Sequence, residues 1–518
     1  MKVPQLKKKT ELKSCHNTSW EDDYSWVHQP NILEVLKDSS KLDPEVRKYL
    51  EEENNYTKHH LKDTKGIQKT LFDEIKGRIK LDDESIPFKD RNYEYWTKTT
   101  TKGNYSIKLR KKIGTDLIEE YWNGDEEKKK LNTEYFGVGD IEVSYNDKIL
   151  GYSLDLKGSE YYTIYLRDIE TNKIISEKIE DTAGGITFSL DDKFIFYSKL
   201  DKFHRPRKIY RHKIGDNISN DKLIFEEKSD AFTVGINLTS DEKYFIITSS
   251  DHNTSEQYYF KSTEENPEPK LIKKRNKGVI YSVNSWDNHF YNHTNEKAED
   301  FKIDYCNDLS IQDWKPYIPA QEETLIGSLF FLNNWILRSE ISNALPKIFV
   351  KNIKTNQEEE IKFTDEKIID PGISFYQKDR DTDLIYLSYS SPKTQSRTYL
   401  YNLKSKERKL VKEQEIPSGH NPEDYIVERL ECNSHDGRKV PITLTRHKKT
   451  KVDGTANVLL YGYGSYGSSM SPSFSSTKFS LIDRDIIWVT AHIRGGMERG
   501  MTVSYTHLRA HETSLHLV

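Results

Sequence analysis

Short runs of aromatic and β-branched residues, separated by polar turns, fill the chain from about residue 80 to residue 412. The turn-then-strand pattern recurs, and its copies VSYNDKILGYS and FSLDDKFIFYS are closely similar. The first apolar residues of the copies are at positions 93, 149, 194, 244, 290, 336 and 384, which are 45 to 56 residues apart. A period of about 50 residues with hairpin texture is typical of a β-propeller, whose blades bury their faces against each other. Seven copies predict seven blades, and an irregular β-sandwich with evenly spaced turns is the alternative.

Apolar residues one helical turn apart precede these repeats, between about residue 20 and residue 80. Asp43 followed by Pro44 is an N-cap and first-turn pair, which predicts the start of a helix. The apolar positions that share a helix face are Val46, Tyr49 and Leu50, then Ile67, Leu71 and Ile75. Two amphipathic helices cannot close a core alone, so we expect this segment to pack on another domain.

Further strands are predicted after the repeats. Residues 426–431 and 440–445 alternate around a polar turn at 435–438, which indicates a hairpin. The runs 458–461 and 486–491 are mostly apolar, as expected of buried strands. A hairpin followed by parallel strands is how an α/β-hydrolase sheet begins.

Composition narrows the class of protein. The chain has 518 residues, enough for two or three domains. It is 35% hydrophobic, 12% aromatic and 31% charged, too aromatic for a disordered chain and too polar for a membrane protein. The net charge of −4 arises from mixed signs, so we expect no nucleic-acid partner. No apolar run approaches the ~18 residues of a membrane span, and none follows the basic N-terminus as in a secretory signal.

The cysteines point to a reducing compartment. Cys15, Cys306 and Cys432 lie far apart, are odd in number and show no CxxC spacing. A disulfide framework or a zinc site is therefore not expected, and we expect a cytoplasmic protein without a metal.

The loop after residue 461 contains two formal motif matches. Residues 462–467 fit GxGxxG, but Tyr463 and Tyr466 fill the slots beside the glycines and no helix follows to hold a pyrophosphate. A GxSxG elbow around Ser465 fails because Tyr463 stands where glycine is needed and the strand-to-helix turn is missing. We therefore expect no nucleotide cofactor and no nucleophile in this loop.

The loop nevertheless belongs to a set of segments that resembles the prolyl oligopeptidase family, most closely its oligopeptidase B branch. The segments, in matching order, are GRIKLDDESIPF at 77–88, SSDHNTSE at 249–256, LSYSSPKT at 387–394, YGYGSYG at 461–467 and HIRGGMERG at 492–500. In the last of these Met497 replaces a glycine of the family. The likeness extends from Trp20 to Met501. It implies an all-β seven-bladed propeller, N-terminal helices and an α/β-hydrolase peptidase domain of which only the beginning is present.

The resemblance also implies roles for individual side chains. Tyr463 would donate its phenol O–H to the tetrahedral oxyanion, because a preorganised donor in a dry site lowers the barrier to acyl transfer. Tyr466 would line the pocket for the residue before the scissile bond, and the alternative is that both tyrosines merely pack in a core loop. His492 and Arg494 would be structural parts of the active-site loop, without a catalytic role.

Beyond Met501 the family would continue to a catalytic Ser within GGSAGG, then to Asp and His, and none of these follows here. The string from Val503 to Thr513 matches a one-frame translation of a sequencing-library adapter, so we interpret it as read-through. We expect four parts: an N-terminal helical segment (1–79), the propeller (80–412), the start of the peptidase domain (413–501) and the adapter-like end (502–518).

The resemblance implies the function of a serine-type endopeptidase that hydrolyses short peptides after Lys or Arg, and we expect a monomer without cofactors. This chain, which lacks the triad, is expected to be inactive. The alternative is a non-catalytic propeller scaffold that binds peptides or proteins.

Overall fold

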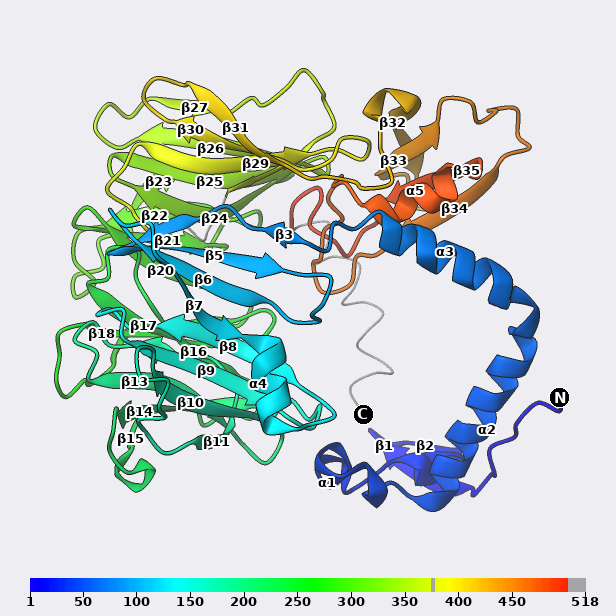
Figure 1. The fold of residues 1–518 in the computed structure, drawn as a ribbon, viewed down its shortest axis with the longest axis horizontal. Helices are drawn as coiled ribbons and strands as arrows, with labels where there is room; N and C mark the ends of the chain where they lie inside the picture. The colour runs from blue at the N-terminus through cyan, green and yellow to red at the C-terminus, as the bar shows by residue number, and fades with distance from the viewer. Residues whose placement is uncertain (374–377, 502–518) are drawn as a thin grey trace.

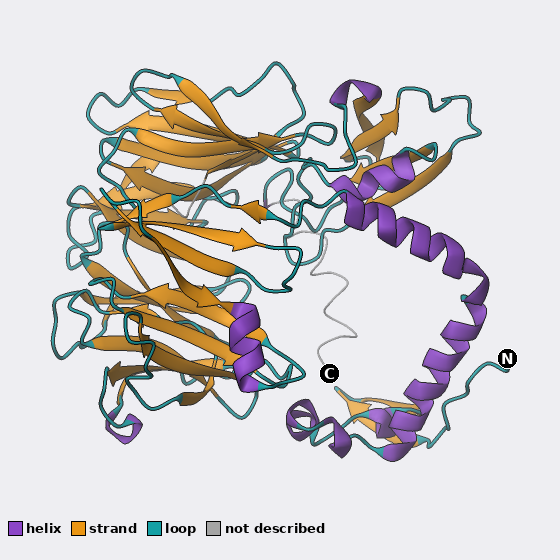
Figure 2. Cartoon of the chain, viewed as in Figure 1, coloured by secondary structure: helices purple, strands orange, loops and turns teal. Residues whose placement is uncertain are grey.

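Strands dominate the computed structural model, which describes residues 1–373 and 378–501 (Figure 1). Figure 2 shows a large body made mostly of strands on one side, and a small sheet and a curved helical arm on the other. The interpretation of residues 502–518 as read-through lies outside the described residues.

The large body consists of consecutive sheets of antiparallel strands, here called blades 1 to 7. The strands of blades 1 to 3 are β3 (Asp83–Glu84), β4 (Phe88–Asp90), β5 (Tyr93–Thr99), β6 (Ile107–Lys112) and β7 (Ile118–Asn123); β8 (Gly137–Val143), β9 (Ile149–Asp155), β10 (Tyr162–Asp168) and β11 (Ile179–Thr182); and β12 (Thr187–Phe188), β13 (Phe194–Leu200), β14 (Pro206–Lys213) and β15 (Lys222–Glu226). Helix α4 (Gly124–Leu131) connects blades 1 and 2.

Blades 4 to 7 have four strands each. They are β16 (Thr233–Leu238), β17 (Tyr244–Ser250), β18 (Ser255–Lys261) and β19 (Lys270–Lys273); β20 (Tyr281–Trp286), β21 (His289–Thr294), β22 (Lys302–Cys306) and β23 (Lys315–Ile318); β24 (Thr324–Leu332), β25 (Trp335–Ser342), β26 (Leu345–Asn352) and β27 (Glu358–Glu360); and β28 (Asp370–Ile373), β29 (Leu384–Ser390), β30 (Arg397–Asn402) and β31 (Arg408–Glu413). Blades 2 and 3 share one eight-stranded sheet, since Thr182 of β11 pairs with Lys199 of β13.

The predicted propeller is confirmed, and the repeats mark one structural position in it. Each repeat begins at, or one residue after, the start of β5, β9, β13, β17, β21, β25 or β29, the central strands that follow the inner strands of their blades. Strand β13 shows why the pattern works. Ile195 and Tyr197 pack in the cluster shared with blade 2, whereas Phe196 between them packs in the cluster shared with blade 4. Alternate side chains thus bury both faces of one blade against its two neighbours.

Six apolar clusters join consecutive blades, from blades 1 and 2 to blades 6 and 7. Among the described residues no such cluster joins blade 7 to blade 1, and no strand is shared between them. Ion pairs cross this junction instead: Lys412 with Asp83 at 2.8 Å, Lys80 with Glu415 at 2.6 Å and Lys89 with Asp379 at 2.9 Å. We call this junction the seam.

The N-terminal segment forms the arm, and its first part differs from the expectation. The arm contains β1 (Glu11–Cys15), β2 (Thr18–Asp22), α1 (Ile32–Lys37), α2 (Pro44–His60) and α3 (Lys65–Gly77). The helical prediction from about residue 20 is wrong before Ile32, because polar β1 and β2 pair as a hairpin that has no periodic apolar face. The Asp43 cap is confirmed, since its carboxylate accepts from the N–H groups of Glu45 and Val46 at 2.7 and 3.2 Å.

The small sheet contains the predicted hairpin and both predicted strands. Its elements are β32 (Tyr425–Asn433), β33 (Lys439–His447), β34 (Asn457–Gly462), α5 (Phe479–Ile482) and β35 (Ile486–Ala491). The strand order is β32-β33-β35-β34, and β34 runs parallel to β35. Strand β34 lies at the edge of the sheet, and its apolar side chains are uncovered, with Leu460 67% exposed.

The arm meets this sheet at α3, where the guanidinium of Arg484 binds Glu74 and that of Arg78 binds Asp483. Single turns of 3-10 helix occur at Ser25–Val27, Ser39–Lys41, Lys62–Thr64, Ile218–Asn220, Pro422–Asp424 and Ser476–Lys478. None of the helices in the described ranges is both long and apolar enough to cross a membrane.

Candidate active site

The two motif loops meet at one edge of the small sheet. Strands β34 and β35 are parallel, so the loops that follow Gly462 and Ala491 leave from the same side. The Gly467 N–H donates to the Gly495 carbonyl at 2.9 Å. A Cβ on Gly464 would lie 2.9 Å from the Arg494 carbonyl oxygen, so glycine allows the close approach of the two backbones.

Tyr463 and Tyr466 lie in the first loop with their rings open to solvent. Tyr463 is 42% exposed, and its hydroxyl makes no hydrogen bond within the described residues. Tyr466 is 74% exposed and adopts a positive φ of 59°. Its ring stacks on His252, which belongs to the turn between β17 and β18, at a centroid distance of 5.6 Å. Neither tyrosine is buried in a core, so the alternative of packing in a core loop is not what the structure shows.

The second loop is held by polar contacts from the hairpin. His492 is buried and its Nε2 lies 2.8 Å from the Thr443 hydroxyl on β33. Burial, together with the positive charge of Arg429, lowers the pKa of His492 to about 4, so its ring is neutral at pH 7. Arg494 binds the Asp436 carboxylate and donates to the Ser434 hydroxyl at 2.8 Å. Both side chains hold the loop in place, as the resemblance implied.

Glu498 is a buried carboxyl that the sequence reasoning did not single out. One oxygen accepts the Met470 N–H at 2.9 Å, which ties the second loop to the first. The other oxygen has no partner within the described residues. Burial raises the pKa of Glu498. In sequence it is one acid among many, and only the fold places it between the loops.

The same loops are fastened to the propeller. The Met501 N–H donates to the buried carboxylate of Asp300 at 2.6 Å, and the Ala344 N–H donates to the Glu498 carbonyl at 2.6 Å. Arg499 pairs with Glu323 at 3.2 Å. The second loop therefore lies against blades 5 and 6, and Tyr466 of the first loop lies against the β17–β18 turn of blade 4.

One Ser–His–Asp arrangement occurs elsewhere in the described part of the chain, in the propeller. The Ser176 hydroxyl lies 2.7 Å from His212 Nε2, and His212 Nδ1 lies 2.7 Å from an Asp221 oxygen. Tyr197 donates to the other Asp221 oxygen at 2.7 Å. The His212 side chain is fully buried and the group joins the β10–β11 connection to blade 3, which identifies a structural network between blades. Its hydrogen-bonded pairs are 36 and 9 residues apart along the chain and match no sequence motif.

No group of three or more His, Cys, Asp or Glu side chains in the described ranges is arranged to hold a metal ion. The three cysteines are free thiols, with Cys306 buried in blade 5 and Cys432 exposed on β32.

Comparisons with known proteins match this architecture. A family model described as "Prolyl oligopeptidase, N-terminal beta-propeller domain" matches residues 4–414. Dipeptidyl aminopeptidase BI from Pseudoxanthomonas mexicana is 30% identical over 517 residues, covering 96% of this chain and 70% of that protein. Protease 2 from Moraxella lacunata is 27% identical, covering 96% of this chain and 71% of that protein.

Solved structures share the fold. Oligopeptidase B from Leishmania major superposes with a TM-score of 0.89 at 24% identity, covering 97% of this chain and 73% of that chain. Oligopeptidase B from Trypanosoma brucei, in a closed form with covalently bound antipain, gives the same TM-score, identity and coverage. The members of the matched family are serine peptidases that act on peptides. The chain therefore belongs to the prolyl oligopeptidase family.

Proposed function

We propose that the complete gene product is a serine-type endopeptidase that hydrolyses short peptides after Lys or Arg. The observation that carries the proposal is the contact between the two loops that follow β34 and β35, with the Tyr463 hydroxyl unbonded within the described residues and Tyr466 stacked on His252 of the propeller. The reaction is acyl transfer through a serine, with histidine as base and aspartate as orienting group. Neither a metal nor an organic cofactor is needed for this chemistry.

Tyr463 is the proposed oxyanion donor. Its hydroxyl is not consumed by any protein acceptor in the described residues, so it is available to a developing negative charge. Tyr466 is the proposed wall of the pocket for the residue before the scissile bond. Its stacking on His252 supports this role, because the contact fixes an exposed ring beside the propeller.

The preference for Lys or Arg rests on the likeness to the oligopeptidase B branch. The propeller is proposed as a size filter that admits short peptides and excludes folded proteins, and the contact of Tyr466 with His252 of blade 4 supports this role.

We further propose that the 518-residue chain is itself inactive. In the described residues the one Ser–His–Asp arrangement is the buried network of Ser176, His212 and Asp221, which lies in blades 2 and 3. Tyr463 can stabilise an oxyanion only after a nucleophile has formed one. The enzyme is proposed to work as a monomer in the cytoplasm.

Substrate preference is the direct test of this proposal. A clone of the complete reading frame should hydrolyse a Lys or Arg ester and lose that activity when treated with a serine-directed phosphonate. A preference for substrates with Pro would instead assign the enzyme to the prolyl endopeptidase branch. Absence of hydrolysis, with a stop codon close to that of Met501, would favour a peptide-binding scaffold.

A further inference from the structure

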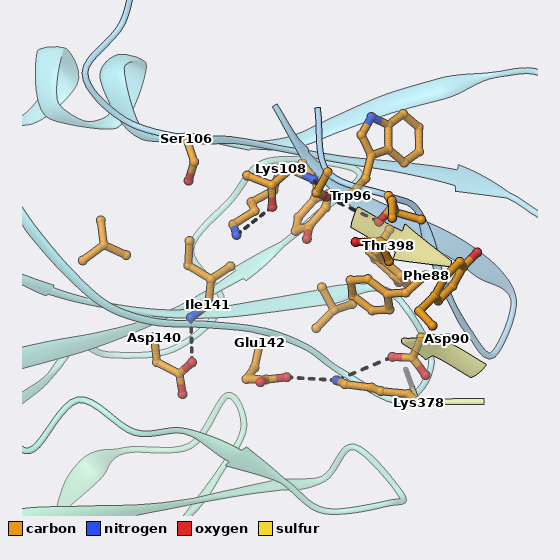
Figure 3. Close-up of a pocket in the computed structure, with 18 of the residues that line it drawn as sticks. Phe88, Asp90, Trp96, Ser106, Lys108, Asp140, Ile141, Glu142, Lys378 and Thr398 are labelled. Atoms are coloured by element: carbon orange, nitrogen blue, oxygen red, sulfur yellow. Dashed lines mark hydrogen bonds and ion pairs between the residues drawn. The ribbon is translucent and has the colours of Figure 1, made fainter. Parts of the chain in front are cut away.

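A cavity of about 1260 Å³ lies where blades 1, 2 and 7 meet, beside the seam that has no apolar cluster. Figure 3 shows Lys108 descending from blade 1 on one side of it, with Lys378 between Glu142 and Asp90 on the other. Its walls also carry aromatic rings from blades 1 and 7, which are Phe88, Tyr95, Trp96, Tyr121 and Tyr386.

The carboxylates on the cavity wall are already paired. Asp140 accepts one backbone N–H with each oxygen, from Ile141 and Ile186, both at 2.9 Å. Glu142 and Asp90 share the ammonium of Lys378 at 3.3 and 3.6 Å. The acidic side chains therefore offer little to a cationic ligand.

The donors on the opposite wall are not paired in this way. Within the described residues the Lys108 ammonium donates only to the Thr97 hydroxyl, at 3.1 Å, and has no carboxylate partner. The Tyr121 hydroxyl makes no hydrogen bond there either. Burial lowers the pKa of Lys108, as expected of an ammonium without a counterion. Because charges taken out of water are generally paired, an anion that entered the cavity would supply the counterion that Lys108 lacks among the described residues.

We propose that this cavity binds the terminal carboxylate of a short peptide, with Lys108 as its counterion and the aromatic walls around its last side chain. The choice of a peptide as the ligand rests on the proposed peptidase function. The carboxylate is chosen because hydrogen-bond donors are in excess on the Lys108 wall. Strands β8 and β28, the first strands of blades 2 and 7, contribute residues to the cavity wall.

Calorimetric titration of the 518-residue chain tests the proposal without turnover. The ligands are an N-acetylated tripeptide that ends in Phe, its C-terminal amide, and acetate. The acid should bind about 10-fold more tightly than the amide, the size expected of a charged hydrogen bond. Lys108→Met keeps the aliphatic stem and should bind acid and amide equally. Lys111→Met is the matched control, because Lys111 lies on the same strand but pairs with Glu94 at 3.2 Å, and it should keep the preference.

Equal binding of acid and amide by the wild-type chain would overturn the proposal whether or not the variants fold. So would a preference that survives in Lys108→Met. Binding of acetate as tight as that of the peptide acid would overturn the peptide assignment. None of these results bears on hydrolysis by the complete gene product, so the peptidase proposal stands or falls separately.

Discussion

Tyr463 and Tyr461 stand two residues apart at the end of β34, and both are 42% exposed. Of the two, only Tyr463 lies in the loop that contacts the second motif loop. Tyr463 could be singled out from the sequence only through the resemblance. Spacing alone gave formal GxGxxG and GxSxG matches, which would have indicated a nucleotide site or a nucleophile. The partners of the second motif loop were not predictable, because Asp300 and Ala344 are more than 150 residues from Met501 and Glu498, which they bind.

Tyr463→Phe in the complete enzyme should lower kcat by about 10²- to 10³-fold, the range for loss of one oxyanion donor. KM and the melting temperature should change little, since the hydroxyl has no partner in the described residues. Tyr461→Phe is the matched control and should leave kcat unchanged. Steady-state kinetics measure both values. An equal loss of kcat in the two variants would show that Tyr463 is not a specific oxyanion donor.

His492 should make the stability of the small sheet depend on pH. Its pKa is about 4 when folded and about 6.5 when unfolded, so the unfolded state takes up the proton first as pH falls. The contribution of neutral His492 to the stability of the sheet is therefore fully present above about pH 6.5. It is lost progressively as the pH falls to about 4, by about 3 kcal/mol in all. In His492→Gln the free energy of unfolding should change less between pH 7 and pH 5. Urea titrations at pH 7 and pH 5, read by hydrogen exchange in β35, measure it, and identical slopes in both proteins would contradict the assignment.

At the scale of elements, the repeats identified the central strand of each blade because its alternating apolar residues pack on two neighbours. The hairpin β32–β33 and the strands β34 and β35 were predictable for the same reason, from local periodicity. The hairpin β1–β2 was not, since its strands ELKSC and TSWED have no apolar face. Nor could periodicity show which junction lacks an apolar cluster, because that depends on how blade 7 meets blade 1.

Reversing a charge in the seam should make the strands beside it open more often. Lys412→Glu replaces the 2.8 Å pair with Asp83 by a repulsion, and exchange of amides in β31 and β3 should speed up by about 2- to 5-fold. Lys409→Glu makes the same change on β31 at an exposed position without an ion pair in the described residues, and should have no such effect. Equal exchange rates in the two variants would show that these ion pairs do not hold blade 7 against blade 1.

At the scale of the whole molecule, stability is expected to be uneven. The propeller blades bury each other, whereas α2 buries only Val46 and α3 buries no residue. Strand β34 is an uncovered edge with Leu460 exposed. The arm and the small sheet touch through ion pairs rather than through a shared core.

Hydrogen exchange on the 518-residue chain should follow that order. Amides in β17 and β25 should be the slowest, and those of α2 and β34 should exchange much faster, because few buried apolar contacts oppose their local opening. Protection of α2 equal to that of β17 would mean that the arm is covered by a surface other than those described.

We propose that the nucleophilic serine of this peptidase is not among residues 1–373 and 378–501. The most direct measurement is mass-spectrometric mapping of a serine-directed phosphonate on the product of the complete reading frame and on the 518-residue chain. We predict one labelled serine in the complete product, beyond Met501, and no label on the shorter chain. A label on Ser176 or Ser465, with loss of activity, would contradict the account.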